Sequence, residues 1–214
     1  MGLRINTNVS SLAAQRSLRN TSEALNGNLR KLSSGSRITR AGDDAAGLAI
    51  SENLRAQIRG FRQAKRNAGD AISLIQTAEG ALGEISNIVI RLRELAIQSS
   101  SDTVGDQERG FSDIEFQTLK EEIDRISQSS EFSGIKLLNG TAGKLEFQIG
   151  VNNDPLQDRI SYDATAADTT LAALGISVDN VGSKLGAQAS LKKLDNSLVH
   201  INGVRARLGA TQNR

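Results

Sequence analysis

Five carboxylates of the chain are spaced in ways that could support metal binding or acid–base catalysis. Asp43 and Asp44 are adjacent in the segment SSGSRITRAGDDAAGLAI, and Asp102, Asp106 and Glu108 cluster in a second polar segment. No histidine or third carboxylate stands at ligand spacing from the pair, and the cluster lacks the twelve-residue pattern of a calcium-binding loop. We therefore interpret the pair as an acidic helix N-terminus stabilised by the helix macrodipole, and the cluster as a solvated turn.

Other residue types that carry enzymatic chemistry are scarce. The chain has no Cys and a single His, His200, so thiol nucleophiles, disulfides and multi-histidine metal centres are excluded. His200 falls in an apolar helical pattern without a Ser or Cys nucleophile motif, and we expect a partly buried structural residue. The early glycines are Gly27, Gly35, Gly42 and Gly47. They match neither of the phosphate-binding loop patterns GxxxxGK(S/T) and GxGxxG. The sequence predicts no enzyme, no cofactor and no metal.

Charge is distributed unevenly along a chain whose net charge is only +2. Residues 1–70 carry 12 Lys/Arg and 5 Asp/Glu, whereas residues 71–214 carry 14 and 19. A basic segment could follow nucleic-acid phosphates, but Phe61 is its only aromatic residue and no DNA-binding motif is present. We favour contact of these cations with acidic surfaces of neighbouring subunits, and expect no nucleic-acid partner.

The elements that position these residues are predicted to be long helices. Pro155 is the only proline, and proline-free sequence permits uninterrupted helices. One apolar stripe with helical spacing consists of Ile72, Ile75, Ala78, Leu82, Ile85, Val89, Leu92 and Ala96. A second stripe consists of Phe116, Leu119, Ile123 and Ile126. Because a Ser-, Asp- and Gly-rich break at residues 99–110 separates the stripes, the two helices are predicted to pack antiparallel.

Two further stripes, close to coiled-coil spacing, each require a partner helix. The first consists of Ile5, Val9, Leu12, Leu18, Leu25, Leu29 and Leu32. The second consists of Leu191, Leu194, Leu198, Ile201 and Leu208. This second pattern is still running at Arg214 without a helix-ending residue, which predicts that the sequence is truncated there.

Only the middle of the chain departs from helical spacing. Candidate strands at 135–138, 145–149 and 160–162 are separated by turn signals at 139–140 and 152–155, which predicts a small β-hairpin region. Residues 163–190 are predicted to be a short surface connection. The chain lacks both a cleavable signal-peptide pattern and the roughly 18 to 20 apolar residues of a membrane span, so we expect no membrane partner. The predicted fold is mainly α, an elongated rod of long antiparallel coiled-coil-like helices with a small β-hairpin region.

Several segments together resemble bacterial flagellin. They are MGLRINTNVSSLAAQRSL, LRKLSSGSRITRAGDDAAGLAISENLRAQIRG, QAKRNAGDAISLIQTAEGALGEI, RLRELAIQSSSDT and EIDRISQSSEFSGIKLLNG. The resemblance covers residues 1–163 and returns at 194–214. It implies an extracellular, non-enzymatic subunit of the flagellar filament, exported through the flagellar type III apparatus without a cleaved signal peptide. The implied partners are other flagellin subunits, the export apparatus, and cap and junction proteins.

The resemblance also implies a division into domains. Residues 1–42 would form the N-terminal filament-core helix and spoke, and residues 43–163 the inner rod domain with its helices and β-hairpin region. Residues 164–185 would be a short linker in place of variable outer domains, and residues 186–214 the start of the C-terminal rod helix. The first stripe, Ile5 to Leu32, would then serve self-assembly.

One recognition surface is carried over residue by residue. Flagellins sensed by the innate Toll-like flagellin receptor present an Arg and a Leu in a QRVRELAVQ-like stretch, and a Glu on the neighbouring helix. The matching residues here are Arg91, Leu95 and Glu115, although Ile90 stands where the family has Gln. Arg91 and Leu95 are one helical turn apart and are predicted to share a face, which could also pack against the next subunit.

Two other classes of protein remain as alternatives. A hook–filament junction protein shares the same terminal helices, but the RINTNVSSLAAQRSL and SSGSRITRAGDDAAGLAI blocks favour flagellin. An enzyme carried in the variable insert would need a catalytic domain, for which residues 164–185 leave no room.

Overall fold

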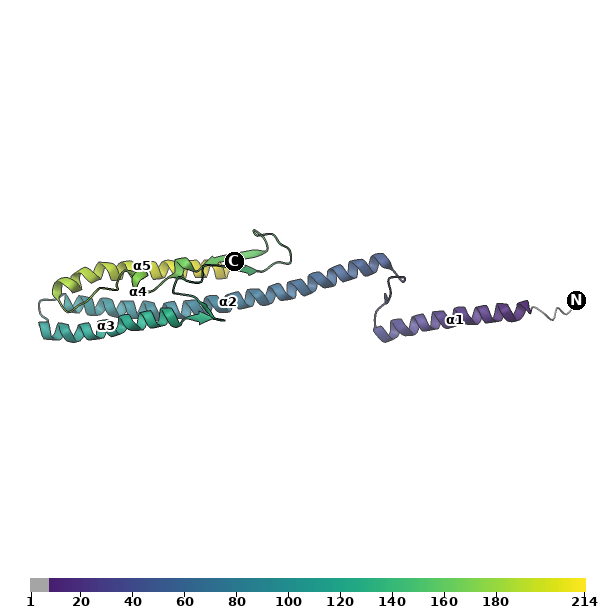
Figure 1. Cartoon of the computed structure of the whole chain (residues 1–214), viewed down its shortest axis with the longest axis horizontal. Coiled ribbons are helices and arrows are strands. Elements are labelled where there is room, and N and C mark those ends of the chain that lie inside the picture. Colours follow the sequence, from purple (N-terminus) through teal and green to yellow (C-terminus); the bar gives the residue numbers. More distant parts are fainter. Residues whose placement is uncertain (1–7) are drawn as a thin grey trace. The chain divides into compact units, whose positions relative to one another are not determined.

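The computed structural model describes residues 8–214 and divides the chain into two compact units, with the boundary after Arg59. The helices in chain order are α1 (Val9–Ser34), α2 (Ala45–Ser99), α3 (Asp106–Ser129), the 3-10 helix η1 (Thr165–Ala167), α4 (Leu171–Leu174) and α5 (Lys184–Asn213) (Figure 1). The strands are β1 (Glu131–Phe132), β2 (Ile135–Lys136), β3 (Lys144–Gln148) and β4 (Arg159–Asp163). The predicted fold class is confirmed, since long helices dominate and the strands form small antiparallel pairs.

Local signals fix both ends of α1. The Asn8 side chain accepts a hydrogen bond from the Ser11 amide at 3.1 Å, which caps the first turn. At the other end Gly35 takes a left-handed conformation, with φ 65°, and its amide bonds to the Leu32 carbonyl. A side chain is rarely tolerated in that conformation, so Gly35 ends the helix where the apolar stripe stops.

The 55-residue helix α2 also has defined ends. Asp44 accepts a hydrogen bond from the Gly47 amide at 2.8 Å, so this carboxylate caps the first turn, and the predicted helix start at this pair is confirmed. At the last turn the buried guanidinium of Arg109 donates to the Ser99 carbonyl at 3.0 Å and to the Ser101 carbonyl at 2.8 Å. Arg109 thereby satisfies carbonyls that have no partner within the helix and anchors the start of α3 against the end of α2.

The core of the second unit lies where α2, α3 and α5 run side by side (Figure 1). Its fully buried side chains include Leu82, Ile85 and Leu92 of α2, Phe116 and Ile123 of α3, and Leu194, Ile201 and Leu208 of α5. These are members of the predicted stripes, and the predicted antiparallel packing of α2 and α3 is confirmed. Ile72 is the exception, because it is 40% exposed and lies before the part of α2 that α3 covers.

The strands form two separate hairpins. β1 pairs with β2 through a turn in which Ser133 and Gly134 both have positive φ, the conformation of a two-residue hairpin loop. β3 pairs with β4 in a five-residue register from Lys144 opposite Asp163 to Gln148 opposite Arg159. The predicted hairpin region is confirmed, but the strand predicted at 135–138 is wrong in extent, since Leu137 and Leu138 leave the ladder and enter the core.

The prediction of a surface connection over residues 163–190 is corrected by burial. Six of its apolar side chains are buried in the core of the second unit: Ala164, Ala167, Leu174, Ile176, Val181 and Ala187. Composition was misleading because small residues bury well without a regular spacing.

Polar contacts also hold this segment. The buried ammonium of Lys120 in α3 donates to the Ser177 carbonyl at 2.9 Å and to the Asp179 carbonyl at 2.8 Å. Burial lowers the pKa of Lys120. The Asp179 carboxylate accepts from Lys193 of α5 at 2.5 Å, and the Val181 amide donates to Asp113 at 2.7 Å. Residues 177–181 are therefore tied to both α3 and α5.

Candidate interaction surfaces

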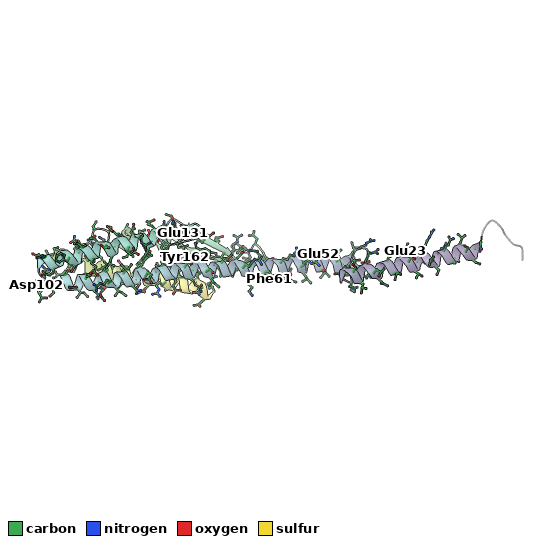
Figure 2. All side chains as sticks on the ribbon, turned by 90° about the horizontal axis from the view of Figure 1, so that it is seen from below. Glu23, Glu52, Phe61, Asp102, Glu131 and Tyr162 are labelled. Carbon is green, nitrogen blue, oxygen red and sulfur yellow. The ribbon has the colours of Figure 1, made fainter. Side chains whose placement is uncertain are left out.

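The apolar stripe of α1 is uncovered in the first unit. No residue of α1 is buried, and its large apolar side chains are between 52% and 82% exposed. They are Val9, Leu12, Leu18, Leu25, Leu29 and Leu32. Side chains project outward all around this helix, Glu23 among them (Figure 2). Ile5, the remaining member of the predicted self-assembly set, lies outside the described residues.

The turn between α1 and α2 uses its carboxylates for local structure. Asp43 accepts hydrogen bonds from the Thr39 amide at 3.0 Å, the Thr39 hydroxyl at 2.9 Å and the Arg40 amide at 3.2 Å. The bond from the Thr39 amide is the main reason why the pKa of Asp43 lies below its ordinary value. Asp44 caps α2, so both carboxylates bind backbone amides near the start of the helix. This agrees with the structural interpretation of the pair.

Arg91 and Glu115 meet on the surface where α2 and α3 run together. The Arg91 Nε donates to Glu115 Oε1 at 2.9 Å, and its Nη1 donates to Glu94 Oε2 at 3.0 Å. Both bonds raise the pKa of Arg91, and the bond to Glu115 contributes more than the bond to Glu94. The side chains of Arg91 and Glu115 are 49% and 46% exposed, so a partner could reach both.

Leu95 does not belong to that surface, which corrects the sequence prediction. It is only 2% exposed and packs in the core with its neighbours Leu92 and Ala96. One helical turn separates Leu95 from Arg91, but α2 is covered on two sides, by α3 and α5, so its buried face is wider than one stripe.

The exposed apolar side chains in this region are different ones. Ile90 and Ile97 on α2 are 46% and 49% exposed, and Phe111 and Ile114 on α3 are 64% and 66% exposed. Sequence reasoning did not single these four out as surface residues. Ile90 and Ile97 are seven residues apart and do not belong to the main stripe of α2. This spacing could have indicated a second apolar face on the helix.

The remaining candidates for chemistry have structural roles. Asp102 pairs with Lys184 of α5 at 2.7 Å, which lowers the pKa of Asp102, and Asp106 pairs with Arg109 at 2.7 Å. His200 is half-buried, with Nε2 2.9 Å from the Asp168 carbonyl, which confirms its predicted structural role. Within residues 8–214, three His, Asp or Glu side chains nowhere come together as a metal site would require.

An apolar groove of about 520 Å³ lies between the early part of α2, the β3–β4 hairpin and the last turn of α5. Its lining includes Phe61, Ile72, Phe147 and Ile160, with Lys65 as a charged member. Its lining contains no Asp, Glu or His side chain that could act as a general acid or base, so its chemistry suits packing rather than catalysis. None of the helices described in residues 8–214 is both long and apolar enough to cross a bilayer.

Comparison with known proteins decides the family. The model for the bacterial flagellin N-terminal helical region matches residues 5–143. The chain belongs to the bacterial flagellin family. A flagellin of Halalkalibacterium halodurans is 47% identical over 186 residues, which cover 87% of this chain and 67% of that relative. The flagellar filament 30.7 kDa core protein of Treponema maltophilum is 40% identical, over 98% of this chain and 77% of the relative.

Solved structures agree with this flagellin fold. The crystal structure of Bacillus cereus flagellin superposes with a TM-score of 0.62 at 34% identity, covering 70% of this chain and 84% of that one. A putative flagellar hook-associated protein from Vibrio parahaemolyticus gives 0.64 at 14% identity, which shows a shared fold alone. Flagellins are structural proteins and not enzymes, and they build the bacterial flagellar filament, which is extracellular.

Proposed function

We propose that this flagellin polymerises with further copies of itself through α1 and that the resulting filament supports swimming motility. The observation that supports this proposal is the exposed apolar stripe of α1. Helices in proteins gain most of their stability by packing an apolar face, and burying one exposed Leu contributes roughly 1.5 to 3 kcal/mol. Contact with other subunits would supply the burial that α1 lacks in the single chain.

Substitution of two central leucines tests this assignment. Leu25→Ser with Leu29→Ser, introduced into the gene in the bacterium that makes the protein, should abolish filaments in electron micrographs and swimming in soft agar. The matched control, Asn20→Ser with Glu23→Gln, changes the opposite side of the same helix and should leave both intact. Filaments of normal length from the leucine variant would overturn the proposal.

The finer division of the molecule belongs to the same proposal. Residues 1–42 would serve the filament core, and residues 43–163 and 186–214 the inner rod. Passage through the flagellar export apparatus, and contact with cap and junction proteins at the filament ends, are the expected further interactions of such a subunit. Support comes from the family, whereas the boundary between the two compact units lies after Arg59, within α2.

The surface around Arg91 favours a second role, recognition by the innate Toll-like flagellin receptor. Arg91 and Glu115 are joined at 2.9 Å and half-exposed, so an acidic and a basic group are presented together in a fixed geometry. Arginine is among the residues that most often dominate the binding energy of protein interfaces. Leu95 is only 2% exposed and is therefore not part of the proposed contact surface.

A reporter-cell assay separates this role from assembly. The concentration of monomeric Arg91→Ala that gives half-maximal receptor signalling should be at least about tenfold higher than that of the unsubstituted protein, as expected for loss of a hot-spot residue. Arg125→Ala is the control, because Arg125 is also exposed and ion-paired, with Glu122 at 2.6 Å. Equal potency of the Arg91 variant and the unsubstituted protein would exclude the site.

A further inference from the structure

The outer face of α3 is an unpartnered helix face that combines apolar and acidic side chains. Phe111 and Ile114, in the first half of the helix, are 64% and 66% exposed. Four carboxylates lie around them: Glu108, Glu115, Glu121 and Glu122. Glu115 and Glu122 are ion-paired with Arg91 and Arg125, whereas within residues 8–214 no cation lies within 4.0 Å of the carboxylate of Glu108 or Glu121.

A basic face of matching character lies on α2. Arg62, Lys65 and Arg66 are exposed and recur at three- and four-residue spacing, so they share one side of the helix. Within residues 8–214, none of the three has a carboxylate within 4.0 Å, whereas most cations elsewhere in the second unit are ion-paired. Phe61, 57% exposed, adds an apolar side chain beside them.

One copy cannot bring its own two faces together. Glu115 of α3 lies level with Arg91 of α2, as their ion pair shows. At 1.5 Å of rise per residue, the stretch of α2 from Arg91 back to Arg66 and Arg62 places the basic face roughly 38 to 44 Å from Glu115 along a continuous helix. The unpaired charges of the two faces, which are Glu108 and Glu121 on α3 and Arg62, Lys65 and Arg66 on α2, can therefore pair with each other only between two molecules.

We propose that the outer face of α3 on one copy binds the basic face of α2, Arg62, Lys65 and Arg66, on a second copy. This rests on the proposed filament role and names the surfaces used. Phe111 and Ile114 supply apolar burial, while the opposite charges fix orientation and register. Because the two faces differ, the contact is heterologous, and a heterologous contact that does not close on itself produces an open helical polymer.

Directed disulfide formation tests the contact without requiring filaments. The chain has no Cys, so single substitutions give unique thiols. Gly69 lies on α2 three residues after Arg66, and a Cβ added there meets nothing within 4 Å, so Gly69→Cys places a thiol next to the basic face. Thr118→Cys places a thiol on the outer face of α3. Mixed under oxidising conditions, with one chain tagged, they should form a mixed dimer about tenfold faster than Gly69→Cys with Val199→Cys, because docking raises the effective concentration of the thiols.

Charge reversal then tests the electrostatic part. Arg62→Glu on the first chain, or Glu121→Lys on the second, should lower the cross-linking rate about threefold to tenfold, and both together should restore it. Lys192→Glu and Glu84→Lys, exposed charges elsewhere, are the controls and should change it little. Raising the salt concentration toward about 1 M should also slow the reaction.

The outcomes separate this contact from the proposed function. Cross-linking no faster than the Val199→Cys control, or insensitive to both salt and charge reversal, overturns the contact even where normal filaments form. Fast, charge-dependent cross-linking in a chain that builds no filaments keeps the contact and overturns the filament role.

Discussion

Tyr162 is a residue whose ionisation can be followed alone, because the chain contains no other tyrosine. It is 5% exposed, and within residues 8–214 its hydroxyl has no hydrogen-bond partner. Burial raises the pKa of Tyr162 to about 12, from an ordinary value of 10.0. We expect the ultraviolet absorbance of the phenolate to appear with a midpoint about two units above that of the unfolded chain in denaturant.

The same shift makes stability depend on alkaline pH. The Tyr162 phenol loses its proton at a lower pH in the unfolded chain than in the folded one. The free energy of unfolding is therefore unaffected by this group below pH 10.0 and falls as the pH rises from there toward about 12. Tyr162→Phe should remove this fall and leave the free energy of unfolding at neutral pH unchanged or raised by about 1 kcal/mol, because the lost hydroxyl had no partner. Urea denaturation followed by circular dichroism measures both. A neutral-pH loss above about 1 kcal/mol would mean that the hydroxyl is bonded after all.

Leu95 shows how far sequence reasoning reaches for a single residue. The spacing of apolar residues placed it correctly on a helix, and the pairing of Arg91 with Glu115 at 2.9 Å agrees with the alignment of the two segments. Its burial could not be predicted, because the number of neighbours that cover a helix depends on long-range packing. Here α5, distant in sequence, covers a second side of α2.

At the scale of elements, regular spacing separates what was predictable from what was not. The apolar stripes at 71–98 and 116–126 follow a period near 3.6 and lie within α2 and α3, but α2 begins already at Ala45 and α3 at Asp106, well before the stripes. Residues 164–185 have no period, so neither their burial nor their contacts could be deduced from composition. Their position depends instead on single polar contacts such as those of Lys120.

Removal of the Lys120 ammonium should loosen this segment. Lys120→Met keeps the length of the side chain but leaves the Ser177 and Asp179 carbonyls without their donor. We expect the free energy of unfolding to fall by about 1 to 3 kcal/mol, the usual cost of unsatisfied buried acceptors. Urea denaturation measures the change, and Lys192→Met, at an exposed site on α5, should stay within about 0.5 kcal/mol. Equal stability of both variants would show that the segment does not depend on Lys120.

For the whole molecule, burial divides the chain unevenly. All of the buried apolar side chains described in residues 8–214 belong to the second unit, and α1 contributes none. Local stability follows buried contacts, so a single chain should open in the first unit far more often than in the core of the second. Such a difference fits a subunit whose first helix gains its contacts from other copies.

Hydrogen exchange of the monomer at neutral pH measures this difference directly. Amides of α1 should exchange at least about 100-fold faster than those of α2 between Leu82 and Leu92, because only the latter are held by a packed core. In filaments, exchange in α1 should slow toward that of the core, since burial of its leucines by neighbouring copies would stabilise the helix. The outer surface of α5 around Val199, 72% exposed, serves as an internal reference for solvent access alone. Strong protection of α1 in the monomer would contradict the view that its apolar row is uncovered, and no slowing on assembly would contradict its role between subunits.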